Sequence, residues 1–297
     1  MKLVVLVDNN TLNDKYYIGE PAVSYYIEVD GEKVLFDTGY SDVFIRNARK
    51  MNINVDNIDA IAISHGHEDH SNGLKYYLDN VRDKRILLYA HPLAFNKKKL
   101  DGEMICSPYS LDLLSEYFEI RTSKNPINLT DNLIFLGEIP SELSFEKRYS
   151  MGRIKIDGEY RDDYLYDDSA LVYKGKNGLF VISGCSHSGI CNIIEYAKKV
   201  CNDDRVVAVI GGFHLTYDDE RLKETIDYFE KNNIKNIYPC HCTSLVAKSK
   251  FINRLGSDVN EVGVSLEIEM EWYYGWKSWA KNIIGFYGIN ATRPNFI

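Results

Sequence analysis

The pattern of apolar and polar residues predicts strands and two helices in the N-terminal part of the chain. Short runs that are apolar, or that alternate apolar with polar residues, are bounded by turn residues and indicate β-strands. These runs cover residues 2–7, 22–29, 33–39, 58–64 and 85–91. Apolar residues that recur every three or four positions instead predict helices over residues 41–51 and 74–81.

The C-terminal half shows a different order of elements. Strands are predicted over residues 169–174, 178–184, 206–215, 234–243 and 262–270. Helices are predicted within residues 185–200 and over 219–232, between successive strands. Strands that first pair as hairpins and later alternate with helices favour a layered α/β fold, with sheets covered by helices.

Two regions depart from this regular pattern. Residues 100–168 are less regular and rich in Tyr, Glu and Asp, so we expect an insertion or lid there. Residues 271–297 contain all three tryptophans, and Trp272, Trp276, Trp279 and Ile283 share one face of a helix. We expect this aromatic extension to pack on its own domain or to join two copies in a homo-oligomer. The alternative is contact with a membrane surface.

Composition limits the class of protein. Apolar residues make up 45% and charged residues 26% of 297 residues, which is typical of one globular α/β domain over residues 1–270. A net charge of −8 argues against a nucleic-acid partner. The start, "MKLVVLVDNN", resembles a strand more than a signal peptide, so we expect a cytoplasmic protein with six reduced cysteines.

The segment "AISHGHEDHSNGL" (62–74) places several residues of metal-ligand type close together. Of seven histidines in the chain, it places His65, His67 and His70 beside Asp69, where a strand ends and a helix begins. Neutral imidazoles and carboxylates are the usual protein ligands of zinc and similar divalent ions. The alternative is a polar turn that only caps the helix, but capping does not need four residues of this kind.

The other four histidines follow a common rule. Each stands at or just past the C-terminal end of a predicted strand: His91, His187, His214 and His241. In layered α/β folds, ligand sites form at that edge of the sheet. We therefore expect several of these histidines to meet the segment at residues 65–70 in one site.

These motifs resemble a known family. "SHGHEDH" (64–70) fits the H-x-H-x-D-H signature of the metallo-β-lactamase superfamily, and "LFDTG" (35–39) resembles its Asp-containing strand end. "SGCSHSGICNI" (183–193), "GGFHL" (211–215) and "PCHCTS" (239–244) resemble the subgroup named for dihydropterin-ribofuranosylaminobenzene-phosphate synthase. The resemblance covers residues 1–270 and implies a four-layer αββα sandwich with a metal site at one edge of its two sheets.

The resemblance also implies a set of metal ligands. His65 and His67 correspond to ligands of one metal, Asp69 and His70 to ligands of a second, and His187 and His241 to later ligands. The position of the metal-bridging Asp holds Cys185 here. Cys185 and Asp168, the neighbour of Asp167, are therefore both candidates either for the bridging position or for a position behind the metal ligands. Asp37, at the end of its strand, is expected to accept a hydrogen bond from a ligating histidine and fix its tautomer, with a purely structural strand-end Asp as the alternative.

Further residues are assigned to substrate and proton transfer. His91 and His214 are expected beside the substrate, as proton-transfer or hydrogen-bonding groups, and Asp69 is expected to take part in catalysis. Lys97 and Lys98 are candidates for contact with a substrate phosphate, with a solvated charge run as the alternative. "GEPAVS" (19–24) stands where the subgroup carries Glu-His-Gly, which separates this chain from the subgroup's usual pattern.

The predicted function is a metal-dependent enzyme that acts on a small molecule. Two divalent ions, zinc or else manganese or iron, would lower the pKa of a shared water and generate hydroxide at neutral pH. The leading interpretation is a dinuclear hydrolase of an ester, phosphoester or related bond. The alternatives are a pterin-aminobenzene ribosyl phosphate synthase-like transferase and a non-catalytic metal-binding module.

Overall fold

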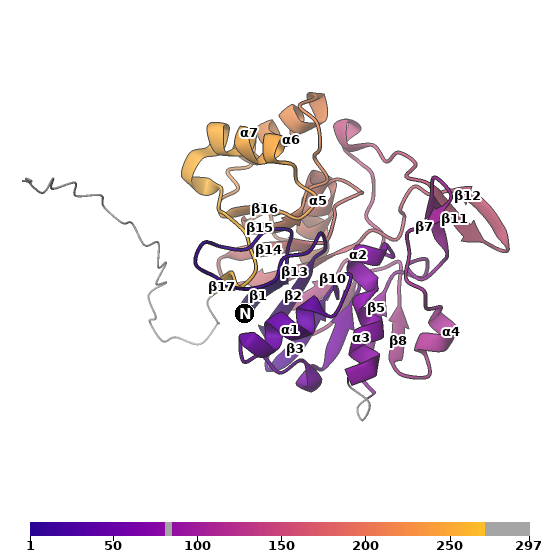
Figure 1. Ribbon diagram of the computed structural model, residues 1–297. Coiled ribbons are helices and arrows are strands. Elements are labelled where there is room, and N and C mark those ends of the chain that lie inside the picture. The colour runs from indigo at the N-terminus through magenta and orange to yellow at the C-terminus, as the bar shows by residue number, and fades with distance from the viewer. Residues whose placement is uncertain (81–84, 271–297) are drawn as a thin grey trace, which may run out of the picture.

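A computed structural model of the protein describes residues 1–80 and 85–270 (Figure 1). Its larger sheet has seven strands in the order β17-β1-β2-β3-β4-β5-β8. Strands β17, β1, β2 and β3 pair antiparallel, whereas β3, β4, β5 and β8 run parallel. The strands are β1 (Lys2–Val7), β2 (Ser24–Val29), β3 (Glu32–Phe36), β4 (Ala60–Ala62), β5 (Leu87–Ala90), β8 (Glu119–Thr122) and β17 (Glu267–Glu269).

A second sheet has six strands in the order β16-β15-β14-β13-β10-β9. Strands β14, β15 and β16 are parallel, so their carboxyl ends meet at one edge, and the remaining pairs are antiparallel. The strands are β9 (Ile127–Asn128), β10 (Leu133–Phe135), β13 (Ala170–Gly175), β14 (Gly178–Ser183), β15 (Val206–Gly212) and β16 (Ile237–Cys240).

Helices cover the outer face of each sheet. The α-helices are α1 (Val43–Lys50), α2 (Glu68–Ser71), α3 (Gly73–Asn80), α4 (Leu111–Leu114), α5 (Ile190–Cys201), α6 (Glu220–Lys231) and α7 (Leu245–Leu255). Three 3-10 turns complete the set: η1 (Val55–Asn57), η2 (Ser144–Glu146) and η3 (Gly256–Asp258). Side-chain caps explain several helix starts, since Asp219 and Ser244 accept hydrogen bonds from the first turns of α6 and α7.

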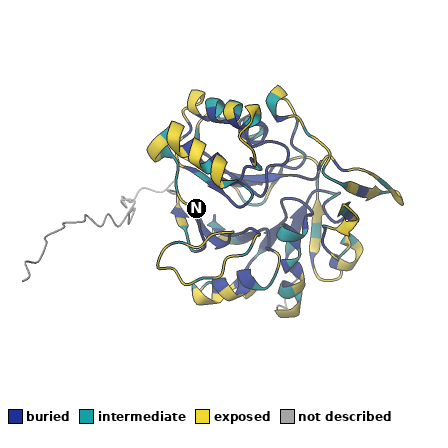
Figure 2. Ribbon diagram, turned by 45° about the horizontal axis from the view of Figure 1, so that its top comes forward, coloured by how far each residue is buried: buried dark blue, intermediate teal, exposed yellow. Residues whose placement is uncertain are grey.

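Three apolar cores hold the layers together. Alternate residues of β1, β2 and β3 pack with alternate residues of β10, β13, β14 and β15 in the central core, which includes Phe36 and Phe180. The opposite faces pack on α1 and α3 in the first sheet, and on α5, α6 and α7 in the second. Figure 2 shows the resulting order, with buried sheets inside and exposed residues on the outer helices. The predicted four-layer αββα sandwich is confirmed.

The region between residues 100 and 168 differs from the expected insertion. Strands β8 and β10 in this region belong to the two main sheets, and Leu133 and Phe135 are fully buried in the central core. These strands are only three or four residues long, which is too short to give a clear periodic pattern. A separate four-stranded sheet, β12-β11-β6-β7, projects beside them (Figure 1). Its strands are β6 (Lys98–Leu100), β7 (Glu103–Met104), β11 (Arg153–Ile156) and β12 (Glu159–Asp162).

The other predicted strands and helices are confirmed, with ends that shift by a few residues. The aromatic extension at 271–297, with its predicted helix and its role in a homo-oligomer, lies outside the described residues. Across residues 1–80 and 85–270, no helix combines the length and the apolar character that a membrane span needs.

Candidate metal centre

The turn after β4 gathers the predicted histidine cluster. His65 and His67 lie in the turn between β4 and α2, and Asp69 and His70 lie in α2 itself. Gly66 stands between the two histidines because a Cβ atom there would lie 1.7 Å from the carbonyl oxygen of Ala94. The turn is therefore pressed against the segment that follows β5, and this contact holds both histidines in the interior.

His65 and His187 belong to the first ligand group together with Cys185, and His67 lies against both of these histidines. The Nε2 atoms of His65 and His187 lie 3.2 Å apart, and the ring of His67 contacts both, with centroids 4.6 and 5.1 Å away. Burial, and then the neighbouring histidines, lower the pKa of His65 and His187 well below the usual value. Burial and the charge of Lys98 lower the pKa of His67 to about 4. All three imidazoles are thus neutral at pH 7, which is the form that binds metals.

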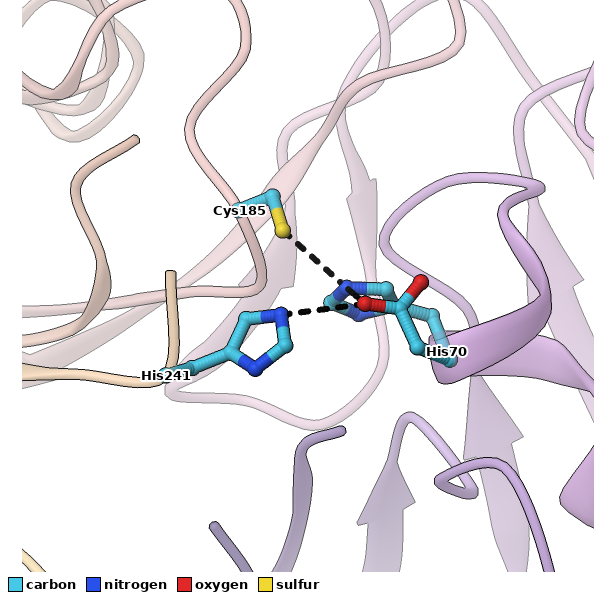
Figure 3. A group of neighbouring side chains, drawn as sticks. His70, Cys185 and His241 are labelled. Carbon is cyan, nitrogen blue, oxygen red and sulfur yellow. Dashed lines mark hydrogen bonds and ion pairs between the residues drawn. The ribbon is translucent and has the colours of Figure 1, made fainter. Parts of the chain in front are cut away.

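Asp69, His70 and His241 form the second group together with Cys185 (Figure 3). Asp69 Oδ2 lies 3.2 Å from His241 Nε2 and 3.5 Å from His70 Nε2, and Cys185 Sγ lies 3.2 Å from His70 Nε2. Burial alone would lower the pKa of His70, but the carboxylates of Asp69 and Asp37 raise it to about 9. Burial would raise the pKa of Asp69, but His70 and His241 lower it below its usual value.

Cys185 lies between the two groups. Its Sγ is within 4.8 Å of ligand atoms of His65 and His187 on one side, and of Asp69, His70 and His241 on the other. Asp168, the other candidate for this position, is in neither group, and its Oδ2 accepts hydrogen bonds from the backbone N–H and the hydroxyl of Ser188. Of the two candidates, the geometry therefore favours Cys185 for the shared position.

A second set of side chains orients the ligands. Asp37 Oδ2 accepts a hydrogen bond from His70 Nδ1 at 2.7 Å and another from the Ser64 hydroxyl, whose oxygen lies 3.0 Å from His65 Nδ1. His241 Nδ1 lies 3.0 Å from Asn9 Oδ1. These contacts engage the Nδ1 atoms, so that the Nε2 atoms of the histidines face the centre.

The backbone conformation after three strands directs polar side chains toward this centre. Asp37, His214 and His241 follow strands β3, β15 and β16, and all three adopt the left-handed region, with φ of 59°, 49° and 47°. Non-glycine residues rarely take this conformation, and where they do they often serve a site. Each strand thus ends in a sharp turn that directs a polar side chain to the shared sheet edge.

The arrangement fits divalent cations. His67 Nε2, His187 Nδ1 and His241 Nε2 are buried yet form no hydrogen bond with the described part of the chain. Unpaired buried nitrogen atoms are costly, and five imidazoles, a carboxylate and a thiol gather in this region. A bound cation would satisfy the Nε2 atoms of His67 and His241.

The two histidines assigned to the substrate lie in different places. His214 lies against the first group, with its ring centroid 4.4 Å from that of His187 and 6.5 Å from that of Tyr149. His91 is buried elsewhere: its Nε2 lies 3.3 Å from Glu138 Oε2 and its Nδ1 accepts the N–H of Leu93. Within residues 1–80 and 85–270, no hydrogen bond or ion pair links His91 to another histidine. This placement favours His214 over His91 as a residue of the site.

The two candidate lysines also differ. Lys97 is exposed, whereas Lys98 is fully buried and its Nζ lies 2.8 Å from both Asp163 Oδ2 and Asp167 Oδ1. Burial alone would raise the pKa of Asp167, but Lys98 lowers it to about 2. Asp167 also accepts the N–H of Gly66. Through Asp167, Lys98 therefore stabilises the turn that carries His65 and His67. Its charge is paired with two carboxylates and is not free for a substrate phosphate, which corrects the role expected from the sequence.

A pocket of about 400 Å³ opens onto this centre. Its polar lining comes from His67, Glu68 and Asp69, and its apolar lining includes Leu100, Ile105 and Met151 at the small four-stranded sheet. Tyr40 and Pro21 also line the pocket. The small sheet, which lies in the region expected to be a lid, thus shapes the approach to the candidate ligands.

Some residues of the centre were not identified from the sequence. Asn9, Ser64 and Tyr149 are such cases, and so is Asp8, whose Oδ1 accepts the backbone N–H of His241. Asp8 and Asn9 directly follow the first strand, and polar residues at a strand end could have indicated them. Tyr149 lies in an irregular segment and carries no comparable signal.

Comparisons with known proteins agree with this geometry. Residues 17–136 match the family model of the metallo-beta-lactamase superfamily. The 7,8-dihydropterin-6-methyl-4-(beta-D-ribofuranosyl)-aminobenzene-5'-phosphate synthase of Methanocaldococcus jannaschii is 32% identical over 273 residues, which cover 87% of this chain and 92% of the relative. An uncharacterized protein of the same archaeon is 33% identical over 250 residues, covering 83% and 92%.

A solved structure supports the same assignment. The crystal structure of a metal-dependent hydrolase of the beta-lactamase superfamily superposes with a TM-score of 0.78 at 29% identity, covering 91% of this chain and 99% of that one. Divalent metal binding is a property that the superfamily implies, and the described residues offer His, Cys and Asp groups for it. The chain belongs to the metallo-β-lactamase superfamily of metal-dependent enzymes, in the group that resembles the dihydropterin-ribofuranosylaminobenzene-phosphate synthase.

Proposed function

We propose that this chain is a hydrolase that uses two neighbouring divalent cations to cleave an ester, phosphoester or related bond of a small molecule. The observation that carries the proposal is the position of Cys185, whose Sγ lies within 4.8 Å of ligand atoms of both groups of side chains. A shared ligand between two groups is the arrangement expected of a dinuclear centre.

The ligand types indicate which cations fit. His65, His67 and His187 would hold one cation, Asp69, His70 and His241 the other, and Cys185 would contact both. Imidazole, carboxylate and thiolate together suit zinc, and the nitrogen and oxygen donors also accept manganese or iron. When bound, such a pair supplies an acidified water and polarises the oxygen of the bond to be cleaved.

The protein's own residues would position the reactants. Asp37 and Ser64 hold the ligand imidazoles in one tautomer by the hydrogen bonds to His70 and His65. His214, in contact with the ring of His187, is placed to hold or move a proton at the edge of the centre. The apolar lining of the adjoining pocket supports a substrate with an uncharged, apolar portion.

The metal content of the purified protein tests this proposal. We expect two divalent metals per chain by plasma mass spectrometry, and about one in each of His187→Ala and His241→Ala, since each variant removes a ligand of a different group. His91→Ala is the matched control, because His91 is buried with Glu138 and belongs to neither group. One metal in the wild type would overturn the dinuclear centre. Two metals without hydrolysis of any nitrophenyl ester or phosphoester would favour a non-catalytic module or the transferase.

A transferase is the second candidate, and the likeness to the synthase over 273 residues favours it. In that case the same cations would activate a pterin unit for attack by an aminobenzene ribosyl phosphate. The test is to incubate the metal-loaded protein with a dihydropterin that carries an activated methyl group and with the ribofuranosylaminobenzene phosphate. A coupled product, absent with His187→Ala, would favour the transferase over the hydrolase.

A further inference from the structure

Two cysteines meet across a strand at the edge of the candidate centre. Cys185 follows β14 and Cys242 follows β16, and strand β15 lies between them in the sheet. The Sγ atoms of both cysteines and a ring nitrogen of His214 nevertheless all lie within 4.8 Å of one another. Both thiols are free. We propose that Cys185 and Cys242 form a reversible disulfide that peroxide generates.

Gly212 makes this approach feasible. It ends β15 directly between the two cysteines, and a Cβ atom at this position would lie 2.5 Å from Cys242 Sγ and 2.8 Å from the carbonyl oxygen of Gly184. The absence of a side chain leaves room for the sulfur of Cys242 over the strand. A disulfide needs the sulfurs to come within about 2.05 Å, so the two side chains still have to move together for the bond to form.

Cys242 differs from the other cysteine of its segment in what it contacts. It belongs to neither of the two metal groups described above; with Cys185 and His214 it forms a third group of ligand-type atoms, and its Sγ lies 3.6 Å from the carbonyl oxygen of Cys185. Cys240, two residues earlier, lies instead in the central core, where its Sγ is 3.1 Å from the hydroxyl of Tyr25. Neighbouring cysteines in one segment thus have separate environments, and only Cys242 faces Cys185.

The chemistry balances with peroxide as the oxidant. Cys242, the less buried of the pair, attacks one peroxide oxygen, so that an S–O bond forms, the O–O bond breaks and water leaves. The sulfur of Cys185 then attacks the sulfur of Cys242, so that the S–S bond forms, the S–O bond breaks and a second water leaves. The two thiols lose two electrons and two protons, and peroxide is reduced to two waters.

The disulfide would also change the centre. Formation of the bond takes the sulfur of Cys185 away from its shared position between the two ligand groups. Loss of this ligand weakens the hold on both cations, so peroxide would release metal and a thiol reductant would restore binding. This consequence rests on the proposed dinuclear function, whereas the disulfide itself does not.

Peptide mapping and thiol titration test the disulfide directly. The purified full chain is treated with hydrogen peroxide, with and without prior chelation of metal. We expect the number of titratable thiols in the denatured protein to fall by two and to recover with dithiothreitol. A tryptic digest should yield a peptide that links residues 177–198 to residues 236–248, formed faster in the chelated protein.

Matched serine variants identify the cysteines, since each linked peptide contains two. Cys242→Ser and Cys185→Ser should abolish the link, whereas Cys240→Ser and Cys191→Ser should retain it. A link that persists in Cys242→Ser, or no link in the folded wild type, overturns the proposal. If the disulfide forms but the metal count is unchanged, the effect on metal is wrong. A wild-type protein without metal that still forms the disulfide would refute the dinuclear function alone.

Discussion

His70 Nδ1 lies 2.7 Å from Asp37 Oδ2, and both side chains are fully buried. The same carboxylate accepts hydrogen bonds from the N–H and the hydroxyl of Ser64, so its partners lie in or beside the histidine turn. A buried carboxylate that is bonded in this way keeps a proton on Nδ1 of His70, so that Nε2 is the nitrogen that would bind a metal. The strand end at Asp37 is thereby connected to the ligand face of His70, although 33 residues separate them.

Asp37→Asn should therefore weaken metal binding without removing a proposed ligand. The amide of Asn would place a donor against His70 Nδ1 or leave that nitrogen without a strong acceptor, which disfavours the tautomer that points a lone pair at the centre. We expect the affinity for one of the two metals to fall by about 10–100-fold. Competition with a chromophoric chelator measures this. Glu138→Gln, next to the remote His91, is the control, and an equal loss in both variants would contradict the role of Asp37.

The histidine turn could be read from the sequence because its geometry is local. His65, His67, Asp69 and His70 lie within six positions, so a strand followed by a helix is enough to bring them together. Residues at the ends of parallel strands were also predictable, since the carboxyl ends of β14, β15 and β16 must meet at one edge. This argument correctly brought His187, His214 and His241 to the same region.

Features that depend on distant partners could not be read in this way. Lys98 lies in a run of three lysines that resembles a solvated surface, and its burial depends on Asp163 and Asp167, more than sixty residues away. His91 follows a strand as the others do, but β5 lies away from the parallel strands of the second sheet. The choice between Cys185 and Asp168 depended on which side chain lies close to both ligand groups, and no sequence pattern indicates this.

The metal-free protein should lose stability as the pH falls below about 6.5. Burial and Lys98 lower the folded-state pKa of His67 from 6.5 to about 4, so the unfolded chain binds this proton more strongly. The stability from a neutral His67 is complete above pH 6.5 and is lost as the pH falls toward 4. The shift corresponds to about 3 kcal/mol at most.

Urea unfolding in the presence of a chelator measures this dependence at pH 7.5, 5.5 and 4.5. His67→Gln should show a smaller loss of stability between pH 7.5 and 4.5 than the wild type, because the variant has no proton to bind there. His70, whose pKa is raised to about 9, has the opposite sign, but it is present in both proteins and cancels in the difference. If both proteins lose the same free energy of unfolding between pH 7.5 and 4.5, His67 is not held neutral by burial.

Lys98→Met should destabilise the protein far more than Lys97→Met. Removal of the Lys98 ammonium leaves Asp163 and Asp167 as buried carboxylates without their cation, which costs about 3–5 kcal/mol. The neighbouring Lys97 is exposed, and its replacement should change stability by at most about 0.5 kcal/mol. Chemical denaturation of the two variants decides between these values, and similar losses would show that the pair around Lys98 is not stabilising.

Gly66→Ala should displace the turn that carries His65 and His67 from the segment after β5. The new Cβ atom would lie 1.7 Å from the carbonyl oxygen and 2.7 Å from the carbonyl carbon of Ala94, so backbone has to move. Gly102→Ala is the comparison, because nothing lies within 4 Å of a Cβ atom there and only its backbone conformation, with φ of +93°, adds about 1 kcal/mol of strain.

Both the stability and the metal content should respond to Gly66→Ala. We expect overpacking to cost about 1–3 kcal/mol, and the displaced turn to take His65 and His67 away from His187, so that the first metal is lost before the second. Gly102→Ala should keep both metals, since it lies outside the ligand groups. Because the turn and the segment after β5 touch at this point, a Gly66→Ala protein with wild-type metal content would mean that their contact does not set the position of the histidines.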